Sequence, residues 1–181
     1  MLKIEENPPI AYPELPLEQF EGPWRVAHTK SRNEKALAWQ LNRWGIPYFL
    51  PLIPHTYRRN GRKFQSMLPL FSGYVFFCGD DEKRYQTLTT NRVSQIIEVI
   101  DQNGLLRELN QINRALNSGL PVDPHPYLKE GTRCRVKAGP LMGFEGIVIQ
   151  KKNVFRILLK VEMLGQAAAV EIDADVLEPL E

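Results

Sequence analysis

The feature that most constrains the fold is the apolar run from Leu70 to Phe77. A small-residue bend at Ser72-Gly73 leads into β-branched and aromatic residues, a composition typical of a strand. Alternation places Tyr74 and Phe76 on one face and the residues between them on the other. Because both faces are apolar, the strand is either central in its sheet or covered on one face by another part of the protein.

The residues before this run predict a strand, a helix and a hairpin. A strand is expected over residues 24–29. Ser31 and Glu34 then have the spacing of a capping box, and apolar residues follow at helical intervals. An extended segment over residues 48–57 leads to Asn60-Gly61, a strong hairpin signal because both residues accept a positive φ.

The rest of the chain predicts a second helical and strand segment and then a separate β domain. We expect a short helix capped by Asp80, a strand over residues 93–100 and an amphipathic helix from Leu105 to Leu116. This order favours an α+β fold, with helices mainly on one side of an antiparallel sheet. Residues 119–128 contain three prolines and are interpreted as a stiff linker. Short, closely spaced strands within residues 132–172 are typical of a small β-barrel.

Charge is unevenly distributed, although the 181 residues have a formal net charge of only +2. Residues 1–22 contain one Lys and five Glu and are interpreted as a mostly disordered tail. Residues 23–128 contain fourteen Lys or Arg against eight Asp or Glu, as expected of a surface that faces nucleic acid. Such a balance also serves ordinary solubility. Residues 129–181 are neutral.

The densest positive charge lies at the tip of the expected hairpin. Such a cluster is either a solvated loop or a set of phosphate contacts, and the residues alone do not decide between them. The nucleic-acid-binding candidates are the four hairpin cations and two on the first helix: Arg58, Arg59, Arg62, Lys63, Arg32 and Lys35.

Signs of catalysis, metal binding and membrane insertion are missing from the sequence. The three histidines are dispersed, and Cys78 and Cys134 have no metal-ligand spacing, so we expect no metal, no cofactor and no catalytic residue. An enzyme is therefore not expected. Without a long apolar run or an export leader, we expect a cytoplasmic protein that does not enter membranes, with reduced thiols.

The sequence also resembles a known family in several blocks. Leu70 to Phe77 resembles the LFPGYVF signature of the NusG transcription elongation factors, with Ser72 where that family usually has Pro. Trp24 to Lys35 resembles the opening strand and helix, and Gly45 to Pro51 the turn into the second strand. Gly139 to Val148 and Met163 to Ile172 resemble a KOW motif. The blocks occur in the family's order.

The resemblance implies two domains with different partners. It places an NGN-like RNA-polymerase-binding domain at residues 23–118 and a KOW domain with an SH3-like barrel at residues 129–181. The protein would be a monomer that binds the clamp helices of the polymerase's largest subunit, bridges the DNA cleft and suppresses pausing or termination. The polymerase contacts would be Leu70, Phe71, Tyr74 and Phe76, and the basic hairpin would lie beside upstream or non-template DNA.

The barrel would recruit a further partner through Met163, Leu164 and Gln166. In relatives this tip contacts the termination factor Rho or a small-subunit ribosomal protein. Leu164 stands where the family usually has Phe, and Gln166 where it has Arg, so at least one of those contacts is expected to be weaker. We expect Rho stimulation to be lost here. The departures at Ser72 and Leu164 and the acidic N-terminal segment suggest a specialised, RfaH-like paralogue.

Two alternatives remain open from the sequence. KOW barrels also occur in ribosomal proteins, so a ribosome- or RNA-binding protein that does not act on polymerase is the second hypothesis. The RfaH branch refolds its C-terminal domain as a helical hairpin, and Arg156 to Leu164 is rich in helix-forming residues. Gly165 interrupts such a helix, so a stable barrel is the prediction and refolding the alternative.

Overall fold

The computed structural model describes residues 6–126, 131–151 and 154–180, except for the side chains of Arg59, Pro126 and Lys151. The chain forms two compact units, an N-terminal unit (Met1–Gln102) and a C-terminal unit (Asn103–Glu181). The expected α+β fold is confirmed, with helices and antiparallel sheets in the first unit and a largely β second unit.

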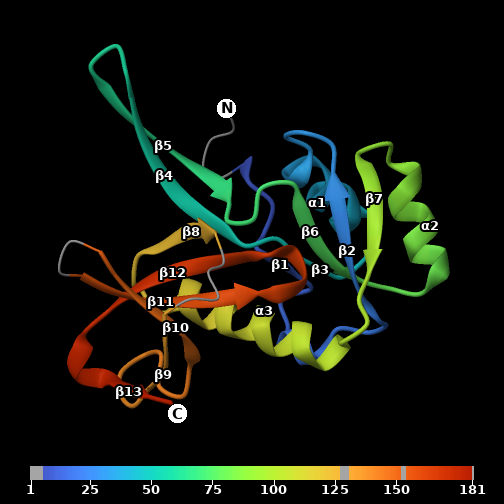
Figure 1. The fold of residues 1–181 in the computed structure, drawn as a ribbon. Coiled ribbons are helices and arrows are strands. Elements are labelled where there is room, and N and C mark those ends of the chain that lie inside the picture. The colour runs from blue at the N-terminus through green and yellow to red at the C-terminus, as the bar shows by residue number, and fades with distance from the viewer. Residues whose placement is uncertain (1–5, 127–130, 152–153, 181) are drawn as a thin grey trace. The chain divides into compact units, whose positions relative to one another are not determined.

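The N-terminal unit is built on a five-stranded antiparallel sheet (Figure 1). The strand formed by the aromatic run, β6 (Tyr74–Cys78), is the third of the five. Of the two alternatives that the apolar pattern allowed, a central position in the sheet is the one observed. The sheet order is β1 (Ala11–Tyr12), β3 (Tyr48–Phe49), β6, β2 (Trp24–Thr29) and β7 (Val93–Glu98).

Both faces of this sheet are buried. Helix α1 (Glu34–Arg43) packs Leu37 and Leu41 against Phe77, and α2 (Asp81–Thr89) adds Leu88 to the same cluster. As expected, Asp80 caps α2, because its carboxylate accepts a hydrogen bond from the Lys83 N–H at 2.9 Å. On the opposite face, the side chains of Val26, Phe49 and Phe76 are fully buried.

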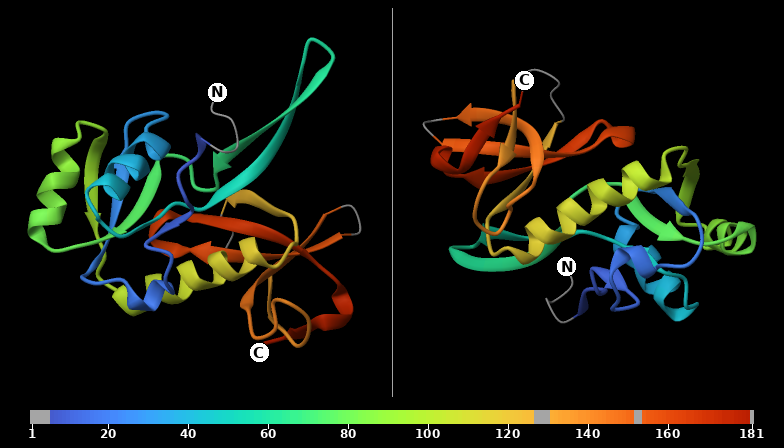
Figure 2. Two further views of the ribbon diagram at one scale, coloured as in Figure 1. Left: turned by 180° about the vertical axis from the view of Figure 1, so that it is seen from behind. Right: turned by 90° about the horizontal axis from the view of Figure 1, so that it is seen from below.

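A long two-stranded ribbon, β4 (Leu52–Arg59) and β5 (Arg62–Pro69), projects from the sheet of the N-terminal unit (Figures 1 and 2). The turn is the expected Asn60-Gly61, with φ of 49° and 73°. The single extended segment expected over residues 48–57 is two strands, β3 and β4. Pro51 lies between them, and its missing N–H cannot continue a sheet ladder.

The prediction of a disordered tail was wrong for residues 6–22. Ala11 and Tyr12 pair with β3, and the side chains of Leu17 and Phe20 are 1% and 8% exposed. Phe20 also stacks on Trp24, with ring centroids 5.6 Å apart. The segment is ordered because its few apolar residues find partners, despite its acidic composition. Residues 1–5 of the predicted tail lie outside the described part.

The C-terminal unit contains helix α3 (Gln102–Asn117), apart from its first residue, and a six-stranded antiparallel sheet. Leu105, Leu109 and Ile112 form the buried face of the helix, which confirms the predicted amphipathic pattern. The sheet fits an SH3-like barrel. Its order is β13 (Leu177–Pro179), β9 (Thr132–Val136), β10 (Glu145–Lys151), β11 (Val154–Val161), β12 (Gln166–Ile172) and β8 (Val122–Pro126).

The predicted linker is not simply a connection. Strand β8 occupies residues 122–126 and pairs with β12 from Val122↔Val170 to Pro126↔Gln166. Because β8 is the last strand in the sheet order, its prolines need no partner on the outer side. Residues 127–130 of the predicted linker lie outside the described part. The division between the units falls after Gln102, the first residue of α3, whereas the sequence placed the domain boundary after residue 118.

No helix in the part of the chain that the structure describes has the length and apolar character needed to cross a membrane.

Candidate functional site

The bend before β6 is fixed by hydrogen bonds to its glycine. The Gly73 N–H donates to the Glu34 carboxylate at 2.7 Å, and the Gly73 carbonyl accepts from the Thr29 N–H at 2.8 Å. The left-handed φ of Gly73, 86°, suits a residue without Cβ. The bend therefore rests on α1 and β2 together.

The predicted capping box was wrong. Helix α1 begins at Glu34, its N-cap is Asn33, and no side chain caps it. Glu34 is 6% exposed, and its carboxylate instead accepts a hydrogen bond from the Gly73 N–H. A buried carboxylate needs a strong donor, and a backbone N–H brought in by the fold supplies it where a local cap would have been expected.

The four candidate polymerase contacts are differently exposed. Leu70 and Phe71 are each 1% exposed and Phe76 is fully buried, whereas Tyr74 is half-buried. The ring of Phe71 meets that of Phe76 edge-on, with centroids 6.1 Å apart. The Tyr74 ring stacks on the imidazole of His28 at 5.1 Å. Of the four, Tyr74 alone presents a substantial exposed surface.

The candidate nucleic-acid contacts gather on the β4–β5 ribbon. In its register Arg58 faces Lys63 and Arg59 faces Arg62, next to the turn. The side chains of Arg58, Arg62 and Lys63 are exposed, and that of Arg59 lies outside the described part. Within the described residues, none of the ion pairs involves these three cations.

The ribbon itself contains cations and no acidic residue, so its own charge is positive. No Asp or Glu occurs in the sequence between Glu34 and Asp80. Cations without internal counter-ions, carried on a projecting hairpin, are suited to contact phosphates.

The two remaining cations have different surroundings. Arg32 is exposed in the turn before α1, with φ of 60°. Lys35 is half-buried, and its ammonium donates to the carbonyl of Met67 in β5. Burial lowers the pKa of the Lys35 ammonium, against a smaller opposing effect of the adjacent Glu34 carboxylate. Lys35 thus ties α1 to the base of the ribbon.

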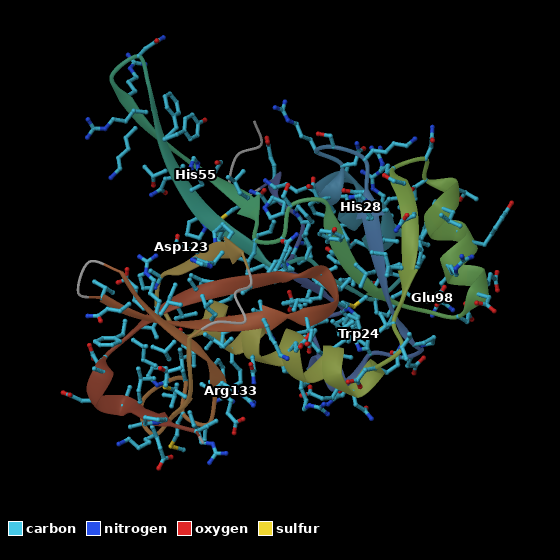
Figure 3. The ribbon with its side chains drawn as sticks, in the orientation of Figure 1. Trp24, His28, His55, Glu98, Asp123 and Arg133 are labelled. Carbon is cyan, nitrogen blue, oxygen red and sulfur yellow. The ribbon has the colours of Figure 1, made fainter. Side chains whose placement is uncertain are left out.

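Sequence reasoning missed a row of rings on one face of the ribbon. His55 stacks on Tyr57, with centroids 6.1 Å apart and 16° between planes, and Tyr57 stacks on Phe64 at 5.6 Å and 19°. Figure 3 shows His55 on the ribbon. The signal was present, because alternation along β4 and pairing across Asn60-Gly61 put these side chains on one face.

The candidate partner-binding tip of the C-terminal unit follows β11. A 3-10 turn over Glu162–Leu164 ends at Gly165, whose φ is 61°, and β12 begins at Gln166. Met163 is 37% exposed, and Leu164 and Gln166 are half-buried. Within the same unit, the Glu162 N–H donates to the carboxylate of Glu108 in α3 at 3.2 Å. The three candidates therefore cluster at one strand connection.

The described residues contain no group of three His, Cys, Asp or Glu side chains that could hold a metal ion. Both cysteines are buried and free of disulfides. Burial raises the pKa of the Cys78 thiol to about 12, and it also raises that of Cys134, so neither is a thiolate at neutral pH. Neither thiol is suited to nucleophilic chemistry.

A cavity of about 690 Å³ lies in the C-terminal unit. Apolar residues such as Leu141 and Phe155 line it, together with the acidic residues Glu171, Asp173 and Asp175. The Glu171 carboxylate is paired with Arg156 at 2.8 Å. This pairing occupies one of the three acidic groups.

Comparison with known proteins agrees with the architecture of the N-terminal unit. No curated protein matches the chain. A family model described as "Transcription termination factor nusG" matches residues 22–118, just over half of the chain. The match includes the bend, the aromatic strand β6 and the basic ribbon. A role in transcription follows, and this chain belongs to the NusG family.

Proposed function

We propose that this protein is a non-enzymatic transcription elongation or antitermination factor. It binds the clamp helices of the largest RNA polymerase subunit, bridges the DNA cleft and suppresses pausing. The barrel recruits a further partner through Met163, Leu164 and Gln166, either Rho or a small-subunit ribosomal protein. The observation that carries the proposal is the NusG match over residues 22–118, which contain every candidate polymerase and DNA contact.

The exposure of the four candidate contacts indicates which of them can meet the polymerase first. Tyr74 is half-buried and accessible to a partner, whereas Leu70, Phe71 and Phe76 are not accessible in the structure. Tyr74 therefore makes the first contact, and the other three contribute only after they become accessible. Aromatic anchors of this kind commonly dominate the binding free energy of an interface.

The mechanism is a shift between clamp states. A protein that binds the closed clamp tenfold more tightly than the open clamp favours closure by about 1.4 kcal/mol. If the pause requires an open clamp, its population falls by the same factor. The exposed cations Arg58, Arg62 and Lys63 support the DNA side, where they would approach phosphates of upstream or non-template DNA.

A single-round transcription assay on a template with a defined pause, with and without an upstream recruitment element, tests this function. The protein should shorten the pause, and Tyr74→Ala should weaken the effect. Tyr85→Ala is the matched control, because Tyr85 is an aromatic residue in the same unit, 68% exposed on α2. Pause lifetimes unchanged by the protein on both templates would refute the proposal.

A pull-down from lysate separates polymerase binding from the ribosomal hypothesis. The tagged protein should retain RNA polymerase, and Tyr74→Ala should retain less of it than Tyr85→Ala. Recovery of ribosomes with no polymerase would favour the ribosome-binding alternative instead.

A further inference from the structure

The row of rings on the ribbon is aligned and accessible. The His55, Tyr57 and Phe64 planes lie within 16° and 19° of their neighbours, so the three rings are close to parallel. His55 is exposed, Phe64 is 40% exposed and Tyr57 is half-buried. We call the surface of these three residues the ring face.

Stabilisation of the hairpin explains only two of the three rings of the ring face. A cross-strand pair of aromatic residues stabilises a hairpin, and Tyr57 opposite Phe64 is such a pair. The stack continues along β4 to His55, which lies opposite Ser66. A third, exposed ring adds little to strand pairing but extends the surface on which a flat ligand can stack.

Positive charge lies at the tip-side end of the ring face. On the same face as Phe64, the next side chain toward the turn is the exposed Arg62, two residues or about 7 Å along the strand. Arg58 and Lys63 are cross-strand partners on the opposite face. The ribbon contains no acidic residue.

Proteins that bind single-stranded nucleic acid combine two elements, aromatic side chains and a positively charged surface, and the ribbon has both. Unpaired bases stack on aromatic side chains, and a positively charged path follows the phosphates. A duplex hides the faces of its bases and would use only the cations. We propose that the ring face is a stacking platform for the unpaired bases of a single-stranded nucleic acid, with Arg62 beside the adjoining phosphate.

This inference deepens the nucleic-acid contact of the proposed function, but its test needs no polymerase. Full-length protein is titrated into a labelled dT oligonucleotide, and fluorescence anisotropy gives the affinity at several salt concentrations. Tyr57→Leu with Phe64→Leu keeps apolar bulk but removes the π faces. This double variant should weaken binding about 5- to 150-fold per base unstacked and leave the salt slope unchanged.

Arg62→Ser should give a different result. Loss of one phosphate contact on a single strand should reduce the slope of log K against log salt by about 0.7. Thr56→Ala with Gln65→Ala is the matched control, since this exposed cross-strand pair lies on the opposite face, adjacent to Tyr57 and Phe64. It should leave affinity unchanged.

The form of the nucleic acid provides the sharpest test. An abasic strand of the same length should bind as weakly as dT binds to the Leu variant, because it has phosphates but no bases. A dT and an rU strand compared side by side identify whether DNA or RNA is preferred. Equal affinity for duplex and single strand, or for abasic and dT strands, would overturn the inference.

One variant keeps the test valid if the Leu substitutions disturb the ribbon. Phe64→Trp retains a ring, so binding should persist, and the new indole should be quenched by dT beyond the quenching of the unaltered protein. No added quenching at saturation would contradict stacking. The pausing assay stands apart from these measurements, so a failed platform would leave the proposed function intact.

Discussion

Replacement of Glu34 by Ala should loosen the bend that precedes the aromatic strand. Glu34 is 6% exposed, and its carboxylate accepts a hydrogen bond from the Gly73 N–H at 2.7 Å. The carbonyl of Gly73 accepts a second hydrogen bond, from the Thr29 N–H at 2.8 Å. Glu34→Ala removes one of these two hydrogen bonds and leaves the Gly73 N–H without the acceptor it has in the unaltered protein.

The expected loss of stability follows from the type of hydrogen bond. A hydrogen bond to a charged group contributes about 1.5–3 kcal/mol to stability, and a neutral one about 0.5–1.5 kcal/mol. Glu34→Ala should therefore lower the free energy of unfolding by about 2–3 kcal/mol. Glu34→Gln keeps an acceptor and should cost about 1 kcal/mol. The exposed Glu21 provides a control, for which Glu21→Ala should remain within about 0.5 kcal/mol.

Urea unfolding followed by tryptophan fluorescence measures this effect selectively. All three tryptophans, Trp24, Trp39 and Trp44, lie in the N-terminal unit, so the signal is insensitive to separate unfolding of the barrel. Equal midpoints for Glu34→Ala and Glu21→Ala would show that the bend does not depend on the carboxylate. Equal losses for Glu34→Ala and Glu34→Gln would show that its charge, rather than its acceptor oxygen, is what matters.

Three further outcomes are expected. The Lys35 pKa is lowered in the folded state, so the unfolded chain binds more protons as pH approaches 10.5 from below, and the contribution of Lys35 to stability should rise there; in urea melts over this range, Lys35→Met should gain less stability, or lose more, than the unaltered protein. The Cys78 pKa is raised to about 12, so the folded state holds its proton longer and the contribution of Cys78 to stability should fall as pH rises above 9; over this range Cys78→Ala should lose less stability, or gain more, than the unaltered protein. The unaltered protein should not enhance Rho-dependent termination in vitro, and Leu164→Phe with Gln166→Arg should increase that activity; enhancement by the unaltered protein would contradict our expectation.

Local patterns predicted the elements whose determinants are local. The alternation around Tyr74 and Phe76 identified the central strand, and Asn60-Gly61 identified the ribbon turn, because φ preferences act within two residues. The capping-box prediction for Glu34 failed because the partner of this residue is distant in the sequence. Its spacing from Ser31 fits a capping box, but a partner 39 residues away, Gly73, outcompetes the local donor.

The N-terminal segment and β8 were missed because their order depends on distant partners. Strand β1 is only two residues long and is defined by pairing with β3, which no periodicity within residues 1–22 can reveal. Strand β8 contains prolines that argue against a strand, and it is tolerated only because it is at the edge of its sheet. Among the candidate contacts, the cations could be identified from the sequence. The hydrogen bond from Lys35 to the Met67 carbonyl could be identified only from the structure.

The segment over which the sequence was ambiguous shows how a sheet overrides helix propensity. Three consecutive alanines, Ala167 to Ala169, favour a helix, yet they lie in β12 at 1%, 0% and 1% exposure between β11 and β8. Small side chains suit a strand packed this closely. On the far side of β11, a Cβ added at Gly146 would clash with the Leu158 carbonyl oxygen, so glycine is required there for the close approach of the two strands. Gly165, at φ of 61°, then ends the 3-10 turn in a conformation that a continuous helix cannot contain. The barrel is therefore favoured by specific contacts at these residues, whatever the average propensity of the segment.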